Sequence, residues 1–95
     1  MIEVVVKSAK TSNTKHLIQA ALDHELRVLN IGIEKTRANL SHLEEQFGMK
    51  SPQFYQQFQL GTMGDNLAWI KWAGEYETYL QLQQDYAELQ EIRLC

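Results

Sequence analysis

The stretch LDHELRVLNIGIEKTRANLSHLEEQFG, residues 22–48, carries the clearest structural pattern of the sequence. Apolar residues recur in it at alternating intervals of four and three positions, and only one position of the series is polar. The series is Leu22, Leu26, Leu29, Ile33, Thr36, Leu40, Leu43 and Phe47. This spacing keeps one side chain per turn on the same helical face, as in coiled coils. We therefore predict one helix over residues 14–47, with Ser12, Asn13 or Thr14 as its N-cap and Gly48 just after its last turn.

Two further helices are predicted after this one. A short helix over residues 52–59 is predicted by Ser51, as its N-cap, and Pro52, at its first helical position. The glycines of the following turn lead to Asp65, which is suited to cap a third helix over residues 66–92. That helix carries an aromatic stripe at three- and four-residue spacing, which is more typical of a core than of a cofactor site. The stripe contains Trp69, Trp72, Tyr76 and Tyr79.

The 95 residues form one domain, because a chain this short cannot bury two cores. Residues 1–12 are rich in valine and predict a short extended arm or strand, with no second strand to pair with. The expected fold is all-α: a long helical hairpin with a short crossing helix at its bend and the arm at its N-terminus.

Composition and charge exclude several classes of function. A formal net charge of -3 argues against a general nucleic-acid binder, since such affinity comes from many Lys and Arg side chains that neutralise phosphates. The only cysteine is Cys95, so we expect neither an intramolecular disulfide nor a thiolate metal cluster. No stretch approaches about 18 uninterrupted apolar residues, the length that predicts a membrane span. We therefore expect a cytoplasmic protein that does not enter the membrane.

A second stripe on the long helix does not fit a closed hairpin. The apolar residues Leu17, Ala21, Val28 and Ile31 keep helical spacing on a different face from the main series. A helix in a two-helix hairpin buries only one face, so this stripe needs another cover. The arm at residues 2–6 and a second chain are both possible covers. We favour a second chain, either another copy in a homodimer or a different protein, because a two-helix hairpin also lacks volume for a self-sufficient core.

The sequence offers no recognised catalytic or metal-binding set. It lacks HExxH, CxxC and phosphate-loop patterns, and none of its histidines follows a glutamate at the Glu-x-x-His spacing that lines di-metal helix bundles. We expect a non-enzymatic protein without cofactor or metal. One enzymatic alternative stays open: Arg37 and His42 resemble the arginine-to-histidine signature of HEPN ribonucleases. In a regular helix these two side chains diverge, because Arg37 flanks the main series and His42 lies on the outer face.

A DNA-binding alternative treats the arm, IEVVVKS, as the strand of a ribbon-helix-helix protein. It requires a turn at NIG, residues 30–32, to separate two helices. The uninterrupted apolar series argues against that turn. Binding of nucleic acid is therefore expected only if it occurs through the arm.

Residues from Gly48 onward carry a family resemblance. They are Gly48, Met49, Phe54, Phe58, Gly61, Gly64, Asp65, Trp72 and Tyr76, and the similarity extends to the VVVKSAKT opening and the EIRLC ending. The series resembles small prokaryotic proteins that are encoded beside a second small gene, in pairs that look like toxin-antitoxin operons. This resemblance implies a non-catalytic antitoxin that covers a toxin's active surface with its helices. The HEPN-like spacing keeps the opposite role, a ribonuclease toxin, open.

Overall fold

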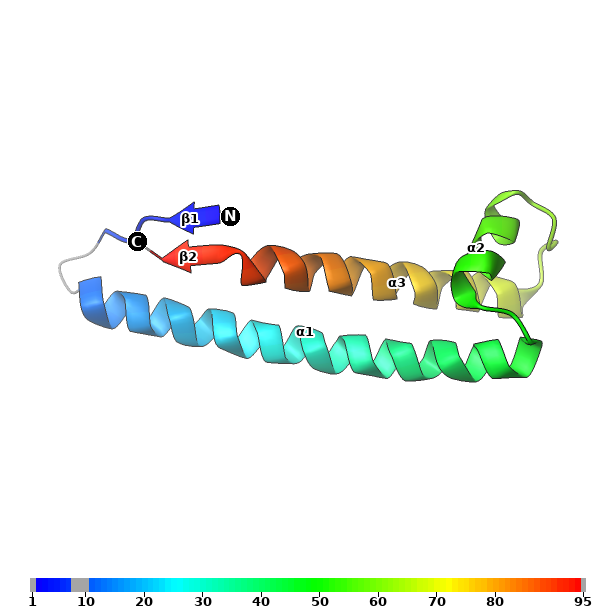
Figure 1. The fold of residues 1–95 in the computed structure, drawn as a ribbon, viewed down its shortest axis with the longest axis horizontal. Helices are drawn as coiled ribbons and strands as arrows, with labels where there is room; N and C mark the ends of the chain where they lie inside the picture. The colour runs from blue at the N-terminus through cyan, green and yellow to red at the C-terminus, as the bar shows by residue number, and fades with distance from the viewer. Residues whose placement is uncertain (1, 8–10, 95) are drawn as a thin grey trace.

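The computed structural model describes residues 2–7 and 11–94. Two antiparallel helices form a hairpin, a short helix crosses at its bend, and two short strands lie at its other end (Figure 1). In chain order the elements are β1 (Ile2–Val4), α1 (Thr11–Phe47), α2 (Ser51–Gln59), α3 (Leu67–Gln90) and β2 (Ile92–Leu94). The predicted all-α hairpin with a crossing helix is confirmed.

The main apolar series of α1 faces α3. Leu29, Ile33 and Leu40 are buried, and so is Thr36, the one polar member. The Thr36 hydroxyl donates a hydrogen bond to the Gly32 carbonyl at 2.9 Å. This buried polar side chain is therefore satisfied within its own helix. The helix runs unbroken through residues 30–32, so the turn that a ribbon-helix-helix fold requires is absent.

The ends of α1 differ in how well the sequence predicted them. Gly48 takes a φ of 66°, and the N–H groups of Gly48 and Met49 both donate to the Glu44 carbonyl, at 2.9 and 3.3 Å. This is the predicted glycine end of the helix. The start was predicted too late, because α1 begins at Thr11. The three candidate caps, Ser12, Asn13 and Thr14, are therefore helical residues of the first turn. Short polar side chains are favoured in a first turn as well as at the cap, because the N–H groups there have no acceptor within the helix.

The starts of α2 and α3 each differ by one residue from the prediction. Lys50 is the N-cap of α2 and gives no side-chain cap, while Ser51, predicted as the cap, is the first helical residue. The Ser51 N–H instead donates to the Glu44 carboxylate at 2.7 Å. Asn66 caps α3 in place of Asp65, and its side-chain oxygen accepts from the Ala68 N–H at 2.8 Å. Either residue type can cap, and only the chain direction at the turn selects between them.

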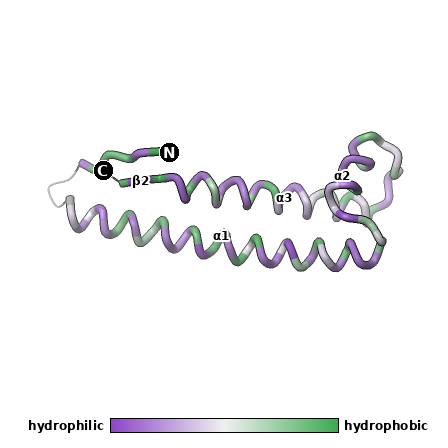
Figure 2. Tube along the Cα trace, in the orientation of Figure 1, coloured by the Kyte–Doolittle hydropathy of each residue, from purple (hydrophilic) through white to green (hydrophobic). Residues whose placement is uncertain are grey.

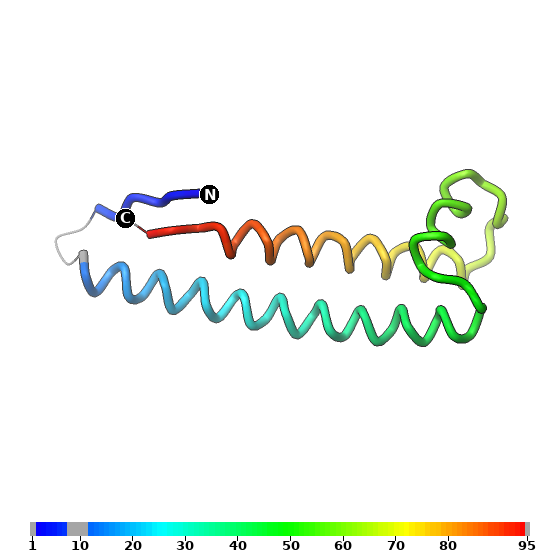
Figure 3. Tube along the Cα trace, viewed as in Figure 1, coloured from blue at the N-terminus to red at the C-terminus, as the bar shows by residue number. Residues whose placement is uncertain are grey.

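The N-terminal strand does have a partner, contrary to the prediction. Helix α3 ends at Gln90 rather than residue 92, and residues 92–94 form β2. β1 and β2 pair in parallel, with Ile2 opposite Ile92, Glu3 opposite Arg93 and Val4 opposite Leu94. The hairpin returns the end of α3 to the start of the chain, so both strands lie at the end opposite the bend (Figure 3).

The core is concentrated at the bend, where α2 packs against α1 and α3. Its buried residues are Leu40, Phe54, Trp72 and Ala73. The rings of Phe54 and Trp72 stack with centroids 3.9 Å apart and an interplanar angle of 3°. Half-buried residues of the aromatic stripe pack around this cluster: Trp69, Tyr76 and Tyr79. The aromatic stripe therefore joins all three helices.

The hairpin is long and thin, with principal extents of 59 × 22 × 18 Å. Hydrophilic and hydrophobic residues alternate along both long helices (Figure 2). Within the described residues, no helix combines the length and apolar character needed to cross a membrane.

Candidate interaction surface

The outward side of α1 carries the apolar stripe that the sequence predicted to need a cover. We call Leu17, Ala21, Val28 and Ile31 the α1 outer face. All four residues are exposed, with Leu17 at 60%, Val28 at 45% and Ile31 at 68%. An apolar helical face of this length in water is typical of a surface that binds another protein.

The rest of the described chain leaves this face open for a geometric reason. Helix α3 packs on the opposite side of α1, along Leu29, Ile33 and Leu40. The arm cannot serve as the second cover, because β1 pairs with β2 at the end of α3. The possibility that residues 2–6 fold back over the α1 outer face is thus wrong for this structure.

The stripe changes character along the helix. Toward the bend it continues through Lys35, Ala38 and His42, which are all exposed. Its large apolar anchors therefore all precede Lys35 and none lies in the last third of α1, next to the bend. Anchors that recur at helical spacing suit recognition of a helix by an apolar groove on a partner. Burying a side chain of this size stabilises a complex by about 1.5 kcal/mol or more, so three large anchors are significant.

Arg37 and His42 are not brought together. The Arg37 guanidinium pairs with the Glu34 carboxylate at 2.8 Å, and its Nε lies 3.4 Å from the Tyr79 hydroxyl. The hydrogen bond to Tyr79 and the charge of Glu34 raise the pKa of Arg37, so it remains a cation engaged in the α1–α3 contact. His42 lies in a different depression, beside Lys71 and Glu75. This arrangement lacks the shared point at which the two side chains could act on one phosphate.

A groove of about 410 Å³ runs between α1 and α3 beside Arg37. Its apolar lining comes from Leu40, Pro52, Tyr76, Tyr79 and Leu80. The charged side chains at its edge already have partners within the chain, since Arg37 pairs with Glu34 and Glu44 receives the Ser51 N–H. We therefore interpret this groove as the outer margin of the aromatic core rather than as a catalytic site.

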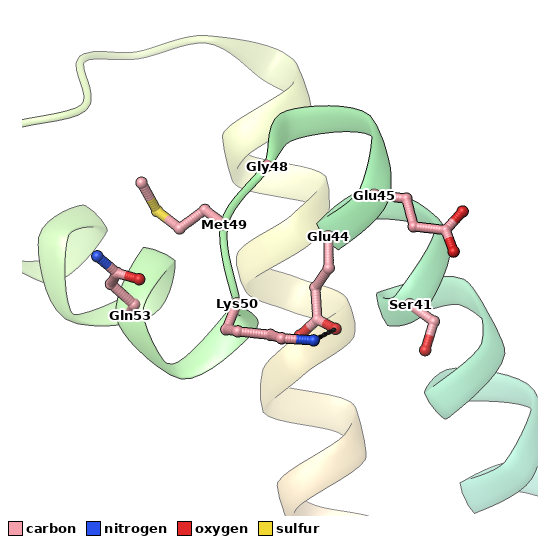
Figure 4. Close-up of a pocket in the computed structure, with 7 residues that line it drawn as sticks. All are labelled: Ser41, Glu44, Glu45, Gly48, Met49, Lys50 and Gln53. Atoms are coloured by element: carbon pink, nitrogen blue, oxygen red, sulfur yellow. Dashed lines mark ion pairs between the residues drawn. The ribbon is translucent and has the colours of Figure 1, made fainter.

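A second depression lies at the corner between α1 and α2, with a volume of about 300 Å³ (Figure 4). Its central carboxylate, Glu44, accepts the Ser51 N–H and pairs with the Lys50 ammonium at 3.9 Å. Ser51 in turn accepts a hydrogen bond from the Trp72 indole N–H at 3.0 Å. These polar groups hold the corner together, so their function is structural.

In the described residues, metal ligands do not cluster and buried polar side-chain atoms are paired. Within residues 2–7 and 11–94, no cluster of three or more His, Cys, Asp or Glu side chains could hold a metal ion. In the same part of the chain, no buried side-chain nitrogen or oxygen lacks a hydrogen-bond partner. Partial burial, followed by a hydrogen bond to Glu77, raises the pKa of the Tyr55 hydroxyl. Tyr55 also packs against Tyr76, with ring centroids 5.1 Å apart, which fits a role in docking α2.

Comparison with known proteins adds no family to this picture. No protein-family model, curated protein or solved structure matches the chain.

Sequence reasoning missed the strand β2, although a signal for it exists. Ile92, Arg93 and Leu94 repeat the apolar, charged, apolar order of Ile2, Glu3 and Val4. The two middle residues carry opposite charges and face each other in the register. The matching patterns at the two ends of the chain could have predicted the pairing.

Proposed function

We propose that this chain is a non-enzymatic, cytoplasmic, helical protein–protein interaction module that acts as the neutralising partner of a toxin in a two-gene system. The α1 outer face is the observation that carries this proposal. It offers three large exposed apolar anchors on a rigid helix, and the described part of the chain supplies no cover for them. The resemblance to antitoxin-like proteins supplies the class of partner.

Neutralisation requires contact and no chemistry. A rigid helix that presents preformed anchors binds with little loss of conformational freedom, since its backbone is already ordered. The α1 outer face would enter a groove on the toxin, while the exposed Lys35 and His42 would lie at the polar rim of the contact. The separation of Arg37 from His42 favours this role over that of a ribonuclease toxin.

The proposal is tested by coexpression with the small protein encoded beside this chain. We expect that protein to arrest growth, and this chain to relieve the arrest and to copurify with it. Val28→Asp and Ile31→Asp should each abolish both effects, because a charge in an apolar contact is left without a partner. Ile70→Asp is the matched control, since Ile70 is also exposed, at 52%, but lies on α3.

Two results would contradict the proposal. One is relief of growth arrest that survives both outer-face substitutions as well as it survives Ile70→Asp. The other is growth arrest caused by this chain alone and lost in Arg37→Ala or His42→Ala, which would establish the toxin role.

A further inference from the structure

The two-stranded sheet at the open end of the hairpin is incomplete. β1 has three residues, all exposed, including Ile2 at 47% and Val4 at 38%. Val5, which follows it, is 65% exposed. Parallel strands normally lie buried in larger sheets, and a lone pair of short strands is marginal in water. An exposed valine-rich edge also invites pairing with another chain.

Within residues 2–7 and 11–94, the edge of β1 away from β2 pairs with no other strand. The hydrogen bonding shows which residues of β1 form this free edge. The Ile2 N–H donates to the Glu91 carbonyl at 3.0 Å, so the backbone polar groups of Ile2 and Val4 point toward β2. Those of Glu3 point away from it, because these groups alternate along a strand in a parallel ladder. If the strand continues, Val5 and Lys7 share this outward direction.

We propose that β1 pairs with β1 of a second copy of this chain, antiparallel and centred on Val5. The two sheets then become one four-stranded sheet in the order β2, β1, β1 of the partner and β2 of the partner. Strand addition of this kind satisfies the backbone groups of both free edges at once. It goes beyond the proposed function and does not depend on it, since the α1 outer face takes no part.

Charge selects this register from its neighbours. A two-fold axis can pair outward residues as Glu3 with Glu3, as Glu3 with Val5, or as Glu3 with Lys7. The first register is unfavourable, because it places like charges opposite each other, and the second leaves the Glu3 carboxylate opposite a valine. The third register is favourable, because it makes two pairs of opposite charge on either side of a central Val5 pair. In the third register Glu3 lies between Arg93 of its own chain and Lys7 of the partner, so charges alternate across the sheet.

The inference is tested by two variants with opposite changes in charge. Lys7→Glu places a carboxylate opposite Glu3 of the other copy, so each contact becomes repulsive. The double variant Glu3→Lys, Arg93→Glu places an ammonium group opposite Lys7 of the other copy, and it keeps opposite charges at the β1–β2 pair of residues 3 and 93. We expect light scattering to give a dimer for the parent, and each variant alone to dimerise about tenfold more weakly. A mixture of the two variants should form a mixed dimer near parental strength, since both of its contacts are then attractive.

Three further variants complete the test. Val5→Pro removes an N–H of the free edge without touching the β1–β2 ladder and should abolish the dimer. Arg27→Glu, the same charge change at an exposed site on α1, should leave it intact, and so should Val28→Asp. A parent that is monomeric from micromolar to millimolar concentration overturns the inference and leaves the edge to a different chain. A dimer that resists Val5→Pro, or a mixture that is no stronger than its components, also overturns it.

Discussion

Trp72 is the residue on which the bend depends. It is fully buried, stacks on Phe54, and lies 5.6 Å from the Phe47 ring, so one side chain contacts residues of α1 and α2 from its place on α3. Its indole N–H also finds an acceptor, the Ser51 hydroxyl. A buried tryptophan without such a partner would leave a donor unsatisfied, at a cost of about 1–3 kcal/mol.

We predict that Trp72→Ala lowers the free energy of unfolding by about 3–5 kcal/mol, because it removes a fully buried ring and leaves a cavity. Urea titration followed by circular dichroism measures this change. Leu67→Ala is the control and should change stability little, since Leu67 is 63% exposed. Equal effects of the two substitutions would mean that Trp72 does not lie in the core.

At the scale of the elements, the sequence predicted what depends on periodicity. The spacing of Leu29, Ile33 and Leu40 placed the buried face of α1, and Gly48 placed its end. The sequence-based prediction failed where a contact between two different elements decides the outcome. The N–H of Ser51 bonds to Glu44 of the preceding helix, and β2 exists because the hairpin brings Ile92 beside Ile2. Neither contact follows from local propensity.

Replacement of glycine by alanine should change the free energy of unfolding in opposite directions at Gly74 and Gly48. Gly74 lies within α3 and an added Cβ would meet no atom within 4 Å, so Gly74→Ala should stabilise the protein by about 1 kcal/mol through helix propensity. Gly48 has equal space but a φ of 66°, so Gly48→Ala should destabilise it by about 1 kcal/mol or more. Urea titrations of both variants measure the pair. Effects of the same sign would show that space rather than backbone conformation governs these positions.

The molecule as a whole is far from compact. Its Cα radius of gyration is 18.6 Å, against about 12 Å for a compact domain of this length. The aromatic core lies at one end, and among the described residues of α1 none before Leu29 is buried. Periodicity could predict the α1 outer face, because spacing places residues on a helix. It could not predict the free edge of β1, because that edge exists only once β2 is in place.

This uneven core predicts a gradient of local stability along α1. Amides near Leu40, under the aromatic cluster, should exchange with solvent only through global unfolding, while those near Leu22 and Leu26 open through smaller fluctuations, since both side chains are only half-buried. We expect opening free energies that differ by about 3 kcal/mol, or on the order of 100-fold in exchange rate. Hydrogen exchange followed by mass spectrometry or NMR measures this gradient in dilute protein.

Hydrogen exchange at a higher concentration of this protein then shows whether a second copy covers the free edge of β1 or the α1 outer face. Pairing of β1 with a second copy should slow exchange at the Glu3 and Val5 amides, which face the free edge, while the Ile2 amide already bonds to Glu91 and should change less. Binding of a partner on the α1 outer face would instead slow the amides near Leu22 and Leu26, because a covered helix opens less readily. Uniform protection along α1 in dilute protein would contradict the gradient, since it requires a more complete cover over Leu22 and Leu26 than α3 and β1 provide.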